Sequence, residues 1–169
     1  QVVTLPPSSR AGWPSGPWDH EPDRVLWRDG DLVCLARRAM NLGAWCGYVG
    51  VGPDHPWQAL SYGRLDQRVE VHGGLTYAAA CKPERLHGCE FGICHTPEPG
   101  EPDGLWWVGF DCAHAGDLTP CAYRPEPWQK LIGGGADLGG GDTYRDLAYV
   151  REEITKLAAQ ARAAQEPTP

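Results

Sequence analysis

The segment Leu-Trp-Trp-Val-Gly-Phe at residues 105–110 is apolar, and Asp-Cys-Ala-His-Ala-Gly-Asp follows it directly at residues 111–117. An apolar run of this kind is typical of a strand that is buried on both faces of a sheet. Successive side chains of a strand point to opposite faces, so Trp106 and Trp107 are expected on different sides. Residues 105–110 therefore predict a central strand, and the polar residues after it are expected at one corner of the sheet.

Shorter apolar runs predict the other strands. Residues 25–27 form one run with turn-type residues after it, and residues 45–51 form another, with glycines suited to close backbone approach. Residues 32–36 fit either a buried strand or a short helix. Residues 69–77 predict a strand that breaks at Gly73-Gly74, with room for a second strand after the break. Together these runs predict a small, mostly antiparallel sheet.

One amphipathic helix is expected near the C-terminal end, from about residue 144 to residue 164. Thr143 and Asp146 have the spacing of a capping box at its start. The helix should pack on one side of the sheet, and residues 81–104 and 118–141 are expected to be long loops. The predicted fold class is α+β. Apolar side chains recur at helical spacing on one face of the helix, at Leu147, Val150, Ile154, Leu157 and Ala161.

The length of 169 residues suits one domain with a real core. We assign residues 23–165 to this single α+β domain and residues 166–169 to a tail. Residues 1–22 are rich in proline and form an extended arm, which either lies against the body through its tryptophans or is a disordered tail. Glycine triplets at 133–135 and 139–141 favour a flexible excursion over a phosphate-binding loop, because no Gly-Lys-Ser/Thr follows them.

The composition argues against several classes of function. A formal net charge of −7 and a pI near 5.3 disfavour bulk binding to nucleic acid or to an anionic membrane, which needs clustered Lys and Arg. No stretch approaches the ~20 apolar residues of a membrane-spanning helix, and the first residues lack the pattern of a signal peptide. Seven cysteines cannot all pair within the chain. We therefore expect a cytoplasmic protein in a reducing compartment.

Histidine and aspartate follow both strand-like segments and predict a metal site. His72 closes the first segment, while Asp111 and His114 follow the second. Two His and one Asp are a common shell for catalytic zinc, which leaves one position for a water whose pKa the metal lowers toward ~7. His72, Asp111 and His114 are thus the candidate ligands of zinc or another divalent metal.

The polar residues near this site have further possible roles. Asp117 and Glu90 are candidate bases that activate the water or orient a ligand imidazole. A metal-free acid/base site is an alternative, because a His beside a carboxylate can titrate near neutrality, and Tyr77 could donate to a developing oxyanion. A Cys112 nucleophile assisted by His72 is a further alternative. A purely structural role, as turn caps and hydrogen-bonded core groups, is open for the same residues.

The loop at 81–104 holds a second cluster, formed by Cys81, Cys89, Cys94 and His95. Three Cys and one His could hold a structural zinc, but the spacing lacks the tight Cys-x2-Cys pair of such sites. A disulfide between two of the cysteines needs an oxidising environment. Buried or idle thiols are therefore the favoured interpretation.

Aromatic side chains offer a route to a non-catalytic function. Eight Trp accompany only two Phe and one Met, so most of the Trp are expected in the core. His55, Trp57 and Trp107 are candidates to line a ligand pocket, where an indole could stack on a planar ring. The partner would be a small-molecule ligand or a host protein.

Several motifs, taken in order, resemble a family of small uncharacterised proteins carried by bacteriophages and prophages. The motifs are residues 47–51 with His55-Pro56, residues 71–77, residues 106–117 and residues 144–150. The resemblance covers about residues 24–160. It implies a phage origin and the cytoplasm of the bacterial host, and it implies no particular activity.

The sequence thus predicts a small phage-encoded, metal-dependent hydrolase that acts on a nucleotide or another small metabolite. The alternative is a non-catalytic phage accessory protein that binds and sequesters a small molecule or a host protein. A minor structural or interaction protein, which would use the arm and the long loops, is a third hypothesis.

Overall fold

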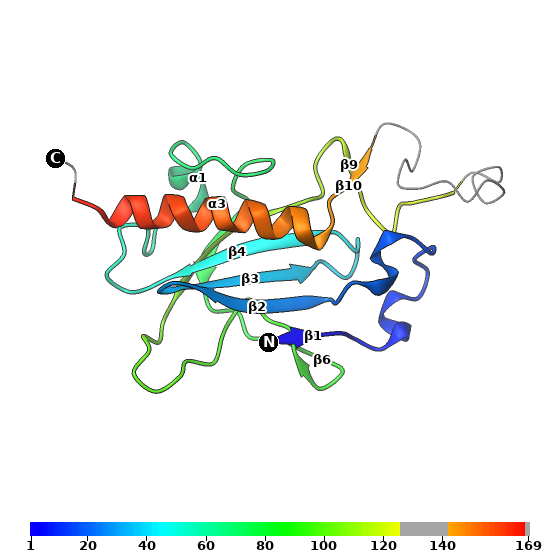
Figure 1. Cartoon of the computed structure of the whole chain (residues 1–169), viewed down its shortest axis with the longest axis horizontal. Coiled ribbons are helices and arrows are strands. Elements are labelled where there is room, and N and C mark those ends of the chain that lie inside the picture. The colour runs from blue at the N-terminus through cyan, green and yellow to red at the C-terminus, as the bar shows by residue number, and fades with distance from the viewer. Residues whose placement is uncertain (126–141, 168–169) are drawn as a thin grey trace.

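Six strands form the central sheet in the computed structural model, which describes residues 1–125 and 142–167. The strand order is β1-β2-β3-β4-β8-β5, and every neighbouring pair is antiparallel. Helix α3 (Leu147–Gln165) packs on this sheet (Figure 1), so the predicted α+β class is confirmed. The strand bounds are Val2–Val3 for β1, Arg24–Asp29 for β2, Leu32–Arg38 for β3, Trp45–Val51 for β4, Trp106–Asp111 for β8 and Tyr77–Ala80 for β5.

Strand β8 is central, as its apolar sequence predicts. It lies between β4 and β5, and all its residues except the first and last are buried. Trp106 packs with the core cluster on the helix side, and Trp107 packs with the cluster on the opposite face. Residues 32–36, which fitted a strand or a helix, belong to β3.

Helix α3 begins at Leu147, later than predicted. Asp146 is its N-cap, and its side chain accepts a hydrogen bond from the Tyr149 N–H at 2.8 Å. The predicted capping box is therefore wrong, because Thr143 and Tyr144 form the short strand β10, which pairs with β9 (Asp117–Leu118). The apolar face is buried against β3 and β4, and helix and sheet approach closely at Gly47, where an added Cβ would lie 2.7 Å from an Ile154 carbon.

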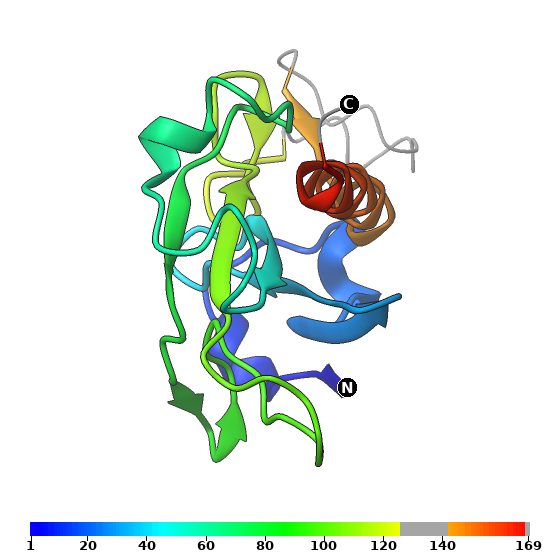
Figure 2. The same cartoon turned by 90° about the vertical axis from the view of Figure 1, so that its left-hand side faces the viewer.

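The face of the sheet away from α3 is covered by irregular chain. Its core cluster joins Val33, Leu35, Tyr48 and Trp107 of the strands to Ile93 of the 81–104 segment. Figure 2 looks along α3 and shows the sheet curving around the helix, with the β6–β7 hairpin on the other side. That hairpin consists of β6 (Arg85–Leu86) and β7 (Cys89–Glu90).

Residues 69–71 are not a strand, which corrects the sequence prediction. Their backbone is bound by helix side chains instead of a neighbouring strand. The Gln160 side chain accepts a hydrogen bond from the Glu70 N–H and donates one to the Glu70 carbonyl, both at 2.8 Å. Only the second part of the predicted segment forms a strand, which is β5. The short helix α1 (Tyr62–Leu65) precedes this loop.

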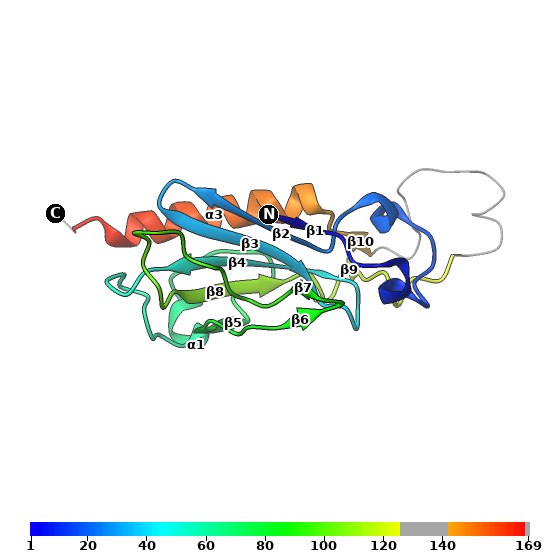
Figure 3. The same ribbon diagram turned by 90° about the horizontal axis from the view of Figure 1, so that it is seen from below.

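The arm at residues 1–22 lies against the body. It contains the 3-10 helices η1 (Pro7–Arg10) and η2 (Pro17–His20), and Trp18 is fully buried. Glu21 accepts hydrogen bonds from the Arg38 side chain and from the Leu147 N–H, at 2.7 and 2.8 Å. Figures 1 and 3 place the arm at the same end of the sheet as β9 and β10.

Two sequence predictions concern other parts of the chain. The glycine triplets at 133–135 and 139–141 lie outside the described residues. No helix among the described residues is long and apolar enough to cross a membrane.

Candidate functional site

Three loops and the start of α3 meet at one corner of the sheet. His72 belongs to the turn before β5, Asp111 ends β8, and Asp117 begins β9. His114 lies between the last two, and Tyr149 is in the first turn of α3. These predicted residues lie in one neighbourhood, and the centroids of the His72 and His114 imidazole rings are 6.1 Å apart.

His72 is held on three sides. Its Nε2 lies 2.7 Å from Asp117 Oδ2, and its Nδ1 lies 2.7 Å from the Tyr149 hydroxyl. Its backbone N–H donates to Glu153 Oε2 at 2.9 Å. An ionised carboxylate only accepts hydrogen bonds, so neutral His72 carries its proton on Nε2 and accepts the Tyr149 O–H at Nδ1. The side chains thus form a continuous carboxylate–imidazole–hydroxyl chain.

Asp117 is the buried end of this chain, with a side chain 1% exposed. Besides His72, it accepts hydrogen bonds from the His114 N–H at 3.0 Å and from Arg145 Nε at 3.1 Å. Burial alone would raise the pKa of the carboxyl, but these hydrogen bonds outweigh it and leave the pKa below its ordinary value. Asp117 is therefore an anion at neutral pH, placed to stabilise a positive charge on His72.

His114 and Asp111 form a second, looser pair. His114 Nε2 lies 3.3 Å from Asp111 Oδ1 but is not aligned for a hydrogen bond, and this buried nitrogen finds no hydrogen-bond partner among the described residues. Thr76 donates to the other Asp111 oxygen at 2.8 Å. Gly73 has a φ of +67°, and a Cβ there would lie 2.2 Å from a His114 ring carbon, so the glycine is needed for the His114 ring to pack here.

The predicted metal ligands do not make a metal shell in this arrangement. Both ring nitrogens of His72 already bind other side chains, so it could ligate only by giving up Asp117 or Tyr149. In residues 1–125 and 142–167, no group of three or more His, Cys, Asp or Glu side chains is placed to hold a metal ion. As the side chains lie, His72, Asp111 and His114 are not placed together as the ligands of one metal ion.

Tyr77 and Glu90, the other two predicted catalytic residues, are not bonded to the predicted cluster at the corner. Tyr77 packs edge-on against Tyr48, with ring centroids 5.4 Å apart, and Glu90 sits in β7 of the hairpin. Within the described part of the chain, neither forms a hydrogen bond or an ion pair with His72, Asp111, His114 or Asp117.

The three predicted ligand-binding residues are largely buried. His55 bonds the Ala161 carbonyl at 2.8 Å and the Trp57 N–H at 2.9 Å, so it ties a loop to α3. Trp107 is fully buried under the 81–104 segment. Trp57 lines a pocket of about 390 Å³, with Pro56, Arg68, Gln160, Ala163 and Ala164.

Sequence reasoning missed Tyr149, Glu153 and Arg145. Tyr149 and Glu153 are four residues apart and therefore share one side of α3, next to the apolar stripe. That spacing was readable in the sequence, but only the contact with His72 shows what the two polar side chains hold. Arg145 precedes the helix, and its guanidinium lies 4.8 Å from the centroid of the Tyr149 ring.

A second pocket, of about 250 Å³, borders the site at Asp117. Its lining includes Thr119, Tyr123, Arg124 and Asp142. This volume suits a small ligand or part of one. Comparisons with protein-family models, with curated proteins and with solved structures find no match to this chain.

Proposed function

We propose that the protein is a small hydrolase that uses general acid–base catalysis at His72, without a bound metal, on a nucleotide or another small metabolite. The observation that carries this proposal is the pair of 2.7 Å contacts that joins Asp117, His72 and Tyr149. In keeping with the motif resemblance, we propose a phage or prophage origin and action in the host cytoplasm.

Tyr149 is the solvent-side end of the chain. The His72 side chain is only 12% exposed and Tyr149 is partly exposed, so we place the reacting water at the Tyr149 hydroxyl. In the proposed step, a water gives a proton to the Tyr149 oxygen as the Tyr149 proton passes to His72 Nδ1. Asp117 stabilises the resulting imidazolium while the water oxygen bonds to the substrate as hydroxide and the bond to the leaving group breaks. The proton on His72 then returns to the Tyr149 oxygen, which passes its own proton to the leaving group. Arg145, beside Tyr149, would hold an anionic group of the substrate.

The test is hydrolysis of chromogenic phosphodiester and ester probes and of nucleoside triphosphates, in the presence of a chelator. The His72→Gln variant should lose on the order of 100-fold or more in rate, the usual contribution of a positioned acid or base. His20→Gln, at an exposed position in η2, is the matched control and should keep the wild-type rate. Activity that a chelator abolishes and zinc restores would favour the metal-dependent version of the hydrolase instead.

A second candidate function, sequestration of a small molecule, is favoured by the pocket that contains Trp57. Its apolar lining from Pro56, Trp57, Ala163 and Ala164, with Arg68 beside it, suits a planar ligand with a negative group. A ligand bound only by the native state raises the melting temperature. A nucleotide whose thermal shift disappears in Arg68→Ala but persists in His72→Gln would support this function.

A further inference from the structure

Residues 81–94 form one hairpin that is closed at its base by a disulfide. Lys82 pairs with Ile93, and β6 pairs with β7 in the same register. Continued by one residue, that register sets Cys81 opposite Cys94, which are disulfide-bonded with their Cα atoms 4.7 Å apart. This finding corrects the expectation of buried or idle thiols for the cluster. His87 and Gly88 both have positive φ, as a two-residue hairpin turn requires.

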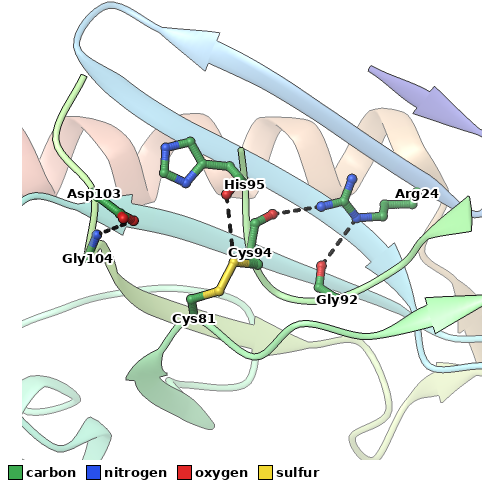
Figure 4. The surroundings of a disulfide bond; sticks show 7 residues. All are labelled: Arg24, Cys81, Gly92, Cys94, His95, Asp103 and Gly104. Carbon is green, nitrogen blue, oxygen red and sulfur yellow. Dashed lines mark hydrogen bonds between the residues drawn. A yellow bond between two sulfur atoms is a disulfide. The ribbon is translucent and has the colours of Figure 1, made fainter. Parts of the chain in front are cut away.

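Two buried side chains dock this hairpin on the sheet. Arg24 of β2 is fully buried, and its Nε and Nη2 donate to the carbonyls of Gly92 and Cys94 at 3.2 and 2.7 Å (Figure 4). Phe91 is also fully buried, in a cluster with Val3 and Leu5. Both anchors act on the second strand of the hairpin, next to Cys94. The disulfide transmits this anchoring to the first strand.

Among the described residues, the 81–104 segment is also attached through the buried Ile93, which packs with Trp107, and through two ion pairs nearer the surface. Arg37 pairs with Glu84 at 3.1 Å, and Arg28 pairs with Glu101. Exposed ion pairs of this kind contribute little to stability. Beneath the segment, Trp107 is fully buried, and within the part of the chain that the structure describes its indole nitrogen has no hydrogen-bond partner. The centroids of the His95 and Trp107 rings lie 6.1 Å apart. Besides the disulfide, the Arg24 hydrogen bonds and the buried side chains of Phe91 and Ile93 hold this cover, and all of them act on the second strand of the hairpin.

We propose that the Cys81–Cys94 disulfide is a redox-sensitive clasp. When it is formed, residues 81–104 stay closed over the Trp107 face of the sheet. A dithiol reductant breaks the S–S bond in a two-electron exchange: the dithiol becomes a disulfide, and its two protons end on the Cys81 and Cys94 sulfurs. The reduced hairpin then opens locally and exposes the Trp107 face. Cys81 is exposed, so a reductant can reach it.

Three of the free cysteines are buried and are not arranged for the same role. Cys34, Cys46 and Cys112 are buried free thiols. Burial raises the pKa of Cys34 to about 12 and that of Cys46 to about 11, so neither is a ready thiolate. The clasp would be closed in an oxidising compartment and open in a reducing one.

Hydrogen exchange on the full chain tests the clasp. Amides in residues 82–104 should exchange on the order of 100-fold faster after reduction with dithiothreitol, as expected for removing a cross-link that closes a loop of this size. Amides of β3, β4 and α3 should keep their rates. The double variant Cys81→Ser with Cys94→Ser should show the fast rates in either condition, and Cys89→Ser should respond to reduction like the wild type.

Three results would overturn the proposal. The first is the absence of a Cys81–Cys94 cross-linked peptide from the air-oxidised chain. The second is equal exchange in residues 82–104 before and after reduction. The third is faster exchange throughout the sheet and α3 on reduction, because the disulfide would then be a staple for the whole fold.

Discussion

Helix α3 presents two neighbouring rows of side chains, an apolar stripe and a polar stripe, and the two have different roles. The apolar stripe, with Val150, Ile154 and Leu157, is completely buried against the sheet. The polar stripe beside it, with Tyr149, Glu153 and Gln160, binds the loop at residues 69–72 through specific hydrogen bonds. Burial of apolar side chains contributes strongly to stability and is non-directional. Hydrogen bonds add little net stability, but they fix the orientation of the groups that they join. We infer that the first stripe holds the fold together and the second positions His72.

The largest loss of stability is expected when the apolar stripe is cut. Ile154→Ala removes a fully buried side chain that packs over Gly47, and should lower the free energy of unfolding by about 2–5 kcal/mol. Urea unfolding followed by far-UV circular dichroism measures this change. Thr155→Ala, on the exposed side of the helix, is the control and should change little. Equal effects of the two variants would contradict the division into stripes.

A smaller loss, and one that depends on pH, is expected for Asp117→Asn. Removing an ionised acceptor of hydrogen bonds should cost about 2 kcal/mol at neutral pH. Because the pKa of the Asp117 carboxyl is lower in the folded state than in the unfolded chain, the carboxylate stabilises the native state at pH values above the unfolded-state pKa of 3.8. This stabilisation is lost as the pH falls through the lower folded-state pKa. The stability difference between the wild type and the variant should therefore shrink as the pH falls below 3.8. A constant difference between them down to pH 2 would contradict this assignment.

The smallest loss of stability is expected for a substitution in the polar stripe at a position that does not contact His72. Gln160→Ala frees the Glu70 backbone and should cost only about 1 kcal/mol of stability. Hydrogen exchange at residues 69–72 should nevertheless rise clearly, because the loop loses its bonds to the helix. A variant that lost several kcal/mol would show that Gln160 supports the core and not the loop.

The apolar parts of the fold were predictable from the sequence, and the polar connections were not. Strand β8 and the buried face of α3 were predicted from local patterns of apolar residues, because such patterns show directly which side chains can be buried. The predicted strand at residues 69–71 failed because Gln160, far away in the chain, satisfies the backbone there. The predicted start of α3 was wrong because Thr143 and Tyr144 pair with β9 as strand β10 and are therefore not part of the helix.

The sequence indicated which residues gather at the candidate site but not how they are bonded. Asp111 ends β8, His114 and Asp117 follow it, and His72 reaches the same corner from the turn before β5. Their partners decide what they can do, and Tyr149 comes from a helix whose placement the sequence does not reveal. The disulfide was missed for a similar reason: pairing Cys81 with Cys94 needs the register set by the His87-Gly88 turn.

Nitrogen NMR of histidine-labelled protein tests the arrangement around His72 most directly. With His72 neutral, the proton should reside on Nε2, and Nδ1 should show an accepted hydrogen bond that disappears in Tyr149→Phe. His20, which is exposed, serves as the internal reference. A proton on Nδ1, or the mixed tautomers of a free imidazole, would contradict the Asp117–His72–Tyr149 chain and the acid–base function built on it.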